Sequence, residues 1–249
     1  MLGDLLFSSI KRAFSAYSAK PFLFMWGSFA YFFLFLVLLL AMFGLLLIYF
    51  MAASLLSYDI SFGLDVGSLP TLLAITVILL LFFYFLGGLN AALAKTYYGA
   101  VDGAKTSLLD FYHYGLSRAP VMFGILLMRE VISVLLIGPV AAIYYYFLTE
   151  YQYMDMLLYL YALCAIFVIH MLFTPAFISA SLGSLPFESF RAAFFTIKTK
   201  HIRFLGMYVL FAIAWLLNFI PLIQLFTVFT VYPIAYSALI LLVSDKGGN

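Results

Sequence analysis

The chain has very little charge and almost no cysteine. Only 9% of its 249 residues are charged and 67% are hydrophobic, whereas soluble domains carry roughly 25% charged and 45–50% apolar residues. A mean hydropathy of +1.18 therefore excludes a soluble domain and predicts a protein embedded in lipid. Because Cys164 is the single cysteine, no internal disulfide can form.

The sequence also lacks the short motifs of common enzyme and cofactor sites. It has no glycine-rich phosphate loop, HExxH, GxSxG or paired cysteines for a metal. Asp102-Gly-Ala-Lys105 resembles the start of the CDP-alcohol phosphotransferase signature, but the later paired aspartates are missing. The formal net charge of only +2 argues against a nucleic-acid partner. We expect a non-enzymatic protein with no cofactor and no metal.

The apolar residues form six continuous runs. A helix needs about 20 apolar residues to cross the hydrocarbon core, and continuous rather than alternating runs favour helices over a barrel. We therefore predict an all-α, polytopic membrane bundle of six transmembrane helices in one domain, residues 1–249. The predicted spans are residues 22–53, 69–94, 120–148, 154–178, 202–220 and 222–243.

The basic residues lie on one side of these spans. Eleven of the twelve Lys and Arg residues precede the first span, follow the sixth, or separate the second from the third and the fourth from the fifth. The other connections hold Asp59, Asp65, Glu150 and Asp155 without any Lys or Arg. By the positive-inside rule, both termini are predicted to be cytoplasmic, in a multi-pass protein of the cell (cytoplasmic) membrane.

Three basic segments space their apolar residues for one face of a helix. The faces are Leu2, Leu5, Leu6, Ile10, Phe14 and Tyr17; then Tyr97, Val101, Ala104, Leu108 and Phe111; then Phe187, Phe190, Phe194 and Ile197. We expect three cytoplasmic amphipathic interfacial helices with their basic residues toward lipid headgroups. The expected headgroup contacts are Lys11, Arg12, Lys20, Lys105, Arg118, Arg191, Lys198, Lys200 and Arg203.

An amphipathic helix, an entering span and a returning span recur three times, at intervals of roughly 80–95 residues, longer than solenoid periods. Aligning Gly124 with Gly206 places Arg118 opposite Lys200. One interpretation is a threefold hairpin repeat. The other is that any hairpin protein obeying the positive-inside rule shows such a period.

Two pairs of segments carry a family resemblance. They are Gly99-Ala-Val-Asp-Gly103 with Ser107-Leu-Leu-Asp-Phe111, and Thr174-Pro-Ala176 with residues 186–194. They resemble uncharacterised prokaryotic six-helix integral membrane families related to the membrane domain of some glycerophosphodiester phosphodiesterases. The resemblance covers Gly87 to Ser244 and implies a fold and a membrane location. It implies no activity, because the soluble catalytic domain of those phosphodiesterases has no counterpart here.

Arg129 and Glu130 are the exception to the charge layout, because they lie inside an apolar run. Ionisable groups at mid-bilayer cost about 2.5–3.5 kcal/mol and mark pathways or paired sites. A span that starts at Pro120 places Arg129 near the membrane centre. One that starts at Val131 places it at the inner interface, where its side chain can snorkel.

His170 lies at a similar depth in the fourth span, so Arg129, Glu130 and His170 are predicted to form a polar cluster in the inner half of the bundle. The alternative is a structural ion pair beside a satisfied buried histidine.

The prolines inside the predicted spans have a structural interpretation. Pro139, Pro175 and Pro233 predict kinks in spans three, four and six.

The preferred function is a non-enzymatic, transport-related or membrane-organising component that acts through lipid contacts and the polar cluster. The first alternative is a permease subunit that works with a cytoplasmic ATPase or another membrane subunit. Residues 99–111 weakly resemble the coupling segment of ABC importer permeases, but they lack its Glu. The second alternative is an intramembrane lipid-modifying enzyme.

Overall fold

A computed structural model describes residues 2–56, 69–148, 153–217 and 220–244. The helices are α1 (Leu2–Ala19), α2 (Pro21–Leu56), α3 (Leu69–Val101), α4 (Leu108–Ile143), α5 (Met154–Ser181), α6 (Pro186–Leu217), α7 (Pro221–Phe226) and α8 (Tyr232–Ser244). Two π-helical segments, η1 (Tyr144–Leu148) and η2 (Thr227–Val231), extend α4 and join α7 to α8. The acidic residues Asp59, Asp65 and Glu150 lie outside the described residues, as does Lys246.

The all-α class is confirmed. Helices make up 94% of the structure, and no strand occurs in the described ranges. Six helices of the described chain are long and apolar enough to cross a membrane. They overlap all six predicted spans, although α3 continues seven residues beyond its predicted end at Ala94 and α6 ends at Leu217, short of the predicted residue 220. The six helices fit a multi-pass membrane protein.

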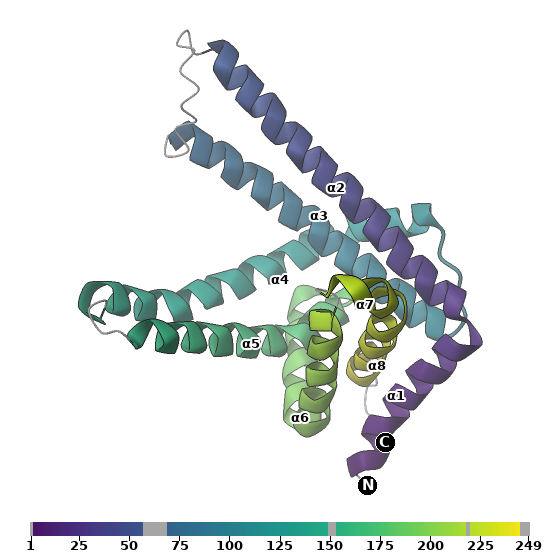
Figure 1. The fold of residues 1–249 in the computed structure, drawn as a ribbon. Coiled ribbons are helices and arrows are strands. Elements are labelled where there is room, and N and C mark those ends of the chain that lie inside the picture. The colour runs from purple at the N-terminus through teal and green to yellow at the C-terminus, as the bar shows by residue number, and fades with distance from the viewer. Residues whose placement is uncertain (1, 57–68, 149–152, 218–219, 245–249) are drawn as a thin grey trace.

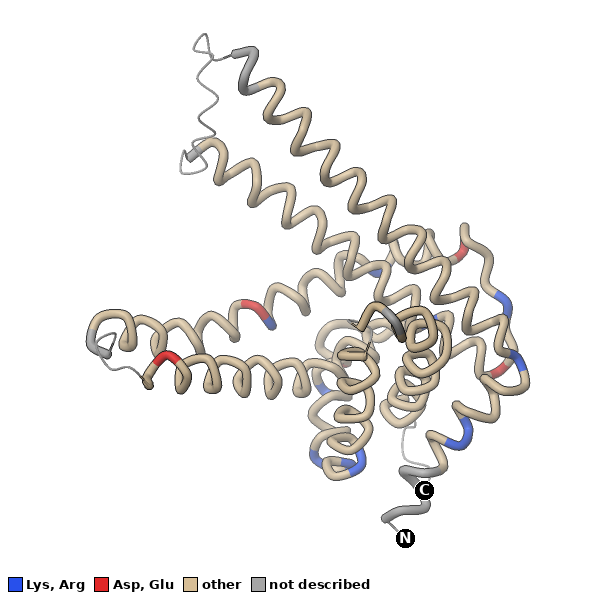
Figure 2. Tube along the Cα trace, in the orientation of Figure 1, with Lys and Arg blue, Asp and Glu red and all other residues tan. Residues whose placement is uncertain are grey.

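The spans form three hairpins, α2 with α3, α4 with α5, and α6 with the α7–η2–α8 segment (Figure 1). The first two hairpins point in different directions and meet only near one end. The described Lys and Arg residues other than Arg129 gather near that end, which we call the inner end (Figure 2). The main core also lies there, where Phe24, Tyr97, Phe111, Phe204 and Leu239 are fully or almost fully buried.

α8 occupies the middle of the inner end. Residues 237–243 are all buried, and α8 packs against α1, α3, α5 and α6. By contrast, the most apolar stretch of α2 has no buried residue. The outer halves of the first two hairpins therefore present apolar side chains on most sides and depend on the surrounding lipid for their solvation.

α3 and α4 cross in close contact. A Cβ added at Gly88 would come within 2.5 Å of the carbonyl oxygen of Gly115, and Ala92 and Ala119 flank the same contact. Small residues four apart on each helix let membrane helices approach backbone to backbone. Beyond this crossing, the two helices continue into different hairpins (Figure 1).

The last span is irregular where α1 and α2 pack against it. Pro233 has no N–H, so the carbonyl of Phe229 loses its normal helical donor. The Tyr17 hydroxyl of α1 donates to that carbonyl at 2.9 Å, and the Ser28 hydroxyl of α2 donates to the Val228 carbonyl at 3.0 Å. Burial raises the pKa of Tyr17, which keeps the phenol protonated as a donor. Side chains of α1 and α2 thus donate hydrogen bonds to two carbonyls of η2.

A basic side chain at the start of each hairpin reaches the end of the same hairpin's returning helix. Lys20, before α2, places its ammonium over Gly103, just after α3. Arg118 of α4 lies against Gly183, just after α5, where an added Cβ would be 2.9 Å from Nη2. Lys200 of α6 donates to the Leu242 carbonyl of α8 at 3.0 Å. Cations are favourable at helix C-termini, so these three inner-end contacts stabilise the hairpins.

The second predicted amphipathic helix, with its face from Tyr97 to Phe111, is wrong because these residues do not form one helix. Tyr97 ends up in α3 and Phe111 in α4, and residues 102–107 form a turn between them. Gly103 adopts a φ of +82°, and Ser107 begins α4 with a capping box to Asp110. The Trp26 indole also donates to the Thr106 carbonyl at 2.7 Å. Helical spacing alone could not detect this turn.

The other two basic segments are helical. α1 ends before Lys20, and α6 has a kink with non-helical torsion angles at Lys200 that separates its basic part from its span. Unlike α6, α4 has no such kink, and its start is continuous with its membrane span. Their placement on a membrane surface stays a prediction, as does the threefold repeat. The side chains of Leu2, Leu5 and Leu6 lie outside the described part.

Replacing Lys200 with Met removes the donor at the end of α8, and we expect it to lower the free energy of unfolding by about 1.5–3 kcal/mol. Lys198→Met is the matched control, because Lys198 is exposed two residues earlier on the same helix. Thermal unfolding in detergent would show a lower midpoint for Lys200→Met only. Equal midpoints for the two variants would contradict a stabilising role for this contact.

Candidate functional site

The structure brings Arg129, Glu130 and His170 together. Arg129 and Glu130 lie part-way along α4, where Figure 2 shows adjacent blue and red positions apart from the basic positions at the inner end. α4 and α5 are the two arms of one hairpin, so residues at matching heights face each other. We call these three residues the polar cluster.

Arg129 is the centre of the polar cluster. Its Nε donates to Glu130 Oε1 at 2.9 Å, and Nη2 donates to the same oxygen. Nη1 lies 3.5 Å from His170 Nδ1, and the guanidinium lies 5.6 Å from the Phe177 ring centroid. An arginine N–H can only donate, so this contact fits a neutral His170 that accepts at Nδ1.

The two charges of the cluster face different surroundings. The Arg129 side chain is 15% exposed, whereas that of Glu130 is 57% exposed. Successive residues on a helix point about 100° apart, so the Arg129 side chain meets α5 while much of the Glu130 side chain stays exposed. The cluster is therefore open on its carboxylate side.

Two further polar residues continue the cluster toward α6. The Thr174 hydroxyl donates to the His170 carbonyl at 2.6 Å, and its side chain lies near Tyr208 of α6. Tyr208 is 6% exposed and packs against Phe167 and Phe204. Sequence reasoning missed both residues, although Thr174 is one helical turn from His170. No pattern in the sequence points to Tyr208, because its helix meets α5 only in the folded chain.

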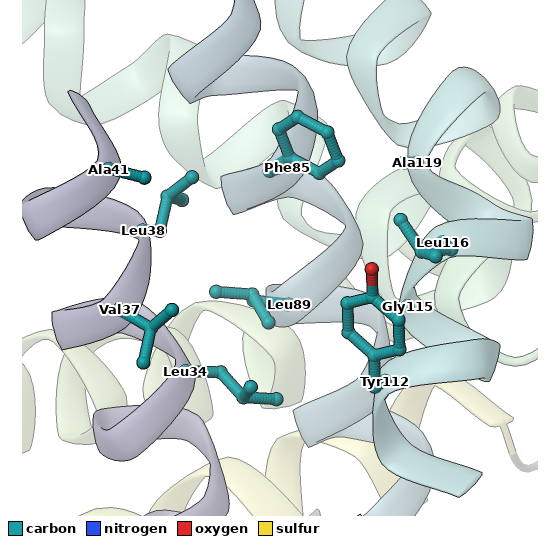
Figure 3. A pocket seen from close by; sticks show the side chains of 10 residues that line it. All are labelled: Leu34, Val37, Leu38, Ala41, Phe85, Leu89, Tyr112, Gly115, Leu116 and Ala119. Carbon is teal, nitrogen blue, oxygen red and sulfur yellow. The ribbon is translucent and has the colours of Figure 1, made fainter. Parts of the chain in front are cut away.

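A second feature lies where the first two hairpins separate. An apolar cavity of about 230 Å³ has α2 and α4 as its walls and Phe85 and Leu89 of α3 as its floor (Figure 3). Leu34, Val37 and Ala41 line it from α2, and the Tyr112 ring lines it from α4. We call it the α2–α4 pocket. Gly115 and Ala119 of the close helix crossing also border it.

The predicted headgroup residues divide into two groups. Lys11, Lys105, Arg191 and Lys198 are exposed near the inner end, and Arg12 pairs with Asp102 at 3.5 Å. Lys20, Arg118 and Lys200 also make the inner-end contacts of the three hairpins. Arg203 is half-buried. Headgroup contact stays a prediction for all nine residues.

Among the described residues, no group of three or more His, Cys, Asp or Glu side chains lies close enough together to hold a metal. No known protein family, curated protein or solved structure matches the chain. The resemblance to the phosphodiesterase membrane domain stays a prediction.

A double-mutant cycle on Arg129 and Glu130 measures how strongly the pair is coupled. Removing the carboxylate in Glu130→Leu leaves a permanent cation without its partner, whereas Glu130 in Arg129→Leu can take up a proton. We therefore expect Glu130→Leu to be the more destabilising single change. The double variant should recover stability, with a coupling of about 0.5–3 kcal/mol in detergent unfolding. Additive effects would contradict the pairing.

Proposed function

We propose that the chain is a non-enzymatic component of the cell membrane that organises lipid around its hairpins, with both termini in the cytoplasm. Of the transport-related and membrane-organising roles, the geometry supports the second best. The observation that carries the proposal is the α2–α4 pocket at the divergence of two hairpins.

The chemistry of the α2–α4 pocket selects its occupant. Its lining is almost entirely carbon, and its walls belong to helices with exposed apolar faces. Water needs polar partners to enter a cavity, and an empty void forfeits the dispersion contacts of its lining. The solvent of these helices is the acyl region of the bilayer. A lipid acyl chain is therefore the occupant of the pocket.

The exposed cations at the inner end support the same role. Lys11, Lys105, Arg191 and Lys198 would lie at the height of cytoplasmic lipid headgroups, where each basic residue contributes about 1 kcal/mol of attraction to an anionic surface. The three inner-end contacts also support a threefold hairpin repeat, because one kind of contact recurs in each hairpin. In this proposal, three similar hairpins hold lipid in the spaces between them.

Filling the α2–α4 pocket should displace its lipid. Ala41→Phe places a ring in the pocket from α2, and Ala52→Phe is a control near the outer end of the same helix. Native mass spectrometry of protein released from lipid nanodiscs should show that Ala41→Phe loses one tightly bound lipid and that Ala52→Phe retains it. Unchanged lipid in Ala41→Phe would overturn the proposal.

The same preparation tests the permease alternative. Recovery of the chain with a nucleotide-hydrolysing partner would favour a permease subunit. Recovery with bound lipid and no such partner would favour the membrane-organising role.

A further inference from the structure

A second groove lies between the arms of the α4–α5 hairpin. It has a volume of about 390 Å³ and is lined by apolar side chains, with Ile132 and Leu136 on α4 and Cys164, Val168 and Phe173 on α5. Tyr161 borders its outer part and donates to the Leu136 carbonyl at 3.0 Å. We call it the α4–α5 groove.

The polar cluster lies beside the inner part of the α4–α5 groove and does not line it. Arg129 lies three residues, just under one helical turn, before the groove residue Ile132, and His170 follows the groove residue Ile169 on α5. Leu172 and Phe173 continue the lining a little further inward. Outward from Arg129 and His170 the groove extends for about 10–13 Å, at a rise of 1.5 Å per residue. A charged cluster thus adjoins an apolar groove, as an amphiphile requires.

The α4–α5 groove runs in the direction in which a lipid of the inner leaflet extends its chains. Tyr144 lies fifteen residues beyond Arg129, or about 22 Å along the helix, and the hydrocarbon core is about 30 Å thick. With Tyr144 at the outer boundary, Arg129 lies in the inner part of the membrane. A lipid of the inner leaflet has its headgroup at the inner end and its chains directed outward, which is how the cluster and the groove are arranged.

The charges of the polar cluster indicate which lipid headgroup would fit beside it. Glu130 engages Nε and one Nη2 proton of Arg129 and His170 faces Nη1, which leaves one N–H on each terminal nitrogen for another acceptor. Guanidinium groups bind phosphate through paired hydrogen bonds. The exposed Glu130 carboxylate has free oxygen lone pairs that suit an ammonium donor. Adjacent positive and negative groups therefore complement a zwitterionic headgroup and repel neither of its charges.

We propose that the α4–α5 groove binds one zwitterionic glycerophospholipid of the inner leaflet, with its phosphate on Arg129, its ammonium on Glu130 and an acyl chain in the groove. This proposal rests on the lipid-organising function and names the headgroup class that one site selects. Thr174 supports the site through its hydrogen bond to the His170 carbonyl, and the buried Tyr208 of α6 lies nearby.

The test uses the full chain in detergent, titrated separately with phosphatidylethanolamine and phosphatidylglycerol of identical acyl chains and followed by native mass spectrometry. For the wild-type chain, we expect at least a fivefold preference for phosphatidylethanolamine, about 1 kcal/mol of binding free energy. Glu130→Gln should abolish this preference, and Arg129→Gln should weaken binding of both lipids. Lys95→Gln, which removes an exposed cation on another hairpin, should change neither.

A substitution inside the α4–α5 groove tests the proposal without removing a charge. Ala165→Trp fills the α4–α5 groove and leaves the polar cluster unchanged, so it should lose the selective lipid and retain the lipid displaced by Ala41→Phe. Equal binding of the two phospholipids by the wild-type chain, or an Ala165→Trp variant that keeps the preference, would overturn this proposal. Either result leaves the lipid-organising function standing, because that function is tested by Ala41→Phe alone.

Discussion

A basic side chain closes each hairpin of this protein by reaching from the start of the hairpin to the end of its returning helix. Lys20, Arg118 and Lys200 make these contacts, with the ends of α3, α5 and α8 respectively. The last carbonyls of a helix carry partial negative charge, which favours a nearby cation, and the Lys200 ammonium also donates to one of these carbonyls. Because all three contacts lie at the inner end, the helices are held together there. The outer arms of the first two hairpins can then diverge.

The divergence of the arms accounts for both candidate lipid sites. Backbone contact at Gly88 and Gly115 holds α3 against α4 at one level, and the α2–α4 pocket opens beside that crossing. The α4–α5 groove opens within a hairpin, next to Arg129 and His170. A membrane helix packs against lipid tails about as readily as against apolar side chains, whereas the side chains around an unfilled cavity lose van der Waals contacts. Lipid is therefore part of the folded assembly in this account, and the polar cluster determines which lipid.

Hydropathy and charge predicted the parts of the fold that the bilayer imposes. The six spans follow from the length of the apolar runs, and the meeting of Arg129 with His170 follows from their similar depth in adjacent spans. Features that depend on tertiary contacts did not emerge. The turn at residues 102–107 needs the positive φ of Gly103 and the capping box of Ser107, and helical spacing continued across it. The contact of the Lys200 ammonium with a carbonyl of α8 was not predicted, because a sequence does not show which helices meet. Neither lipid site is visible in the sequence, since each combines residues from different helices.

The most direct test of the account is an experimental structure of the chain in lipid nanodiscs containing phosphatidylethanolamine and phosphatidylglycerol. The account predicts lipid density in the α4–α5 groove, with a phosphate within hydrogen-bonding distance of Arg129 and an acyl chain that runs outward past Ile132 toward Tyr161. A groove closed by protein side chains, or a polar cluster that faces only protein with no lipid beside it, would contradict the account.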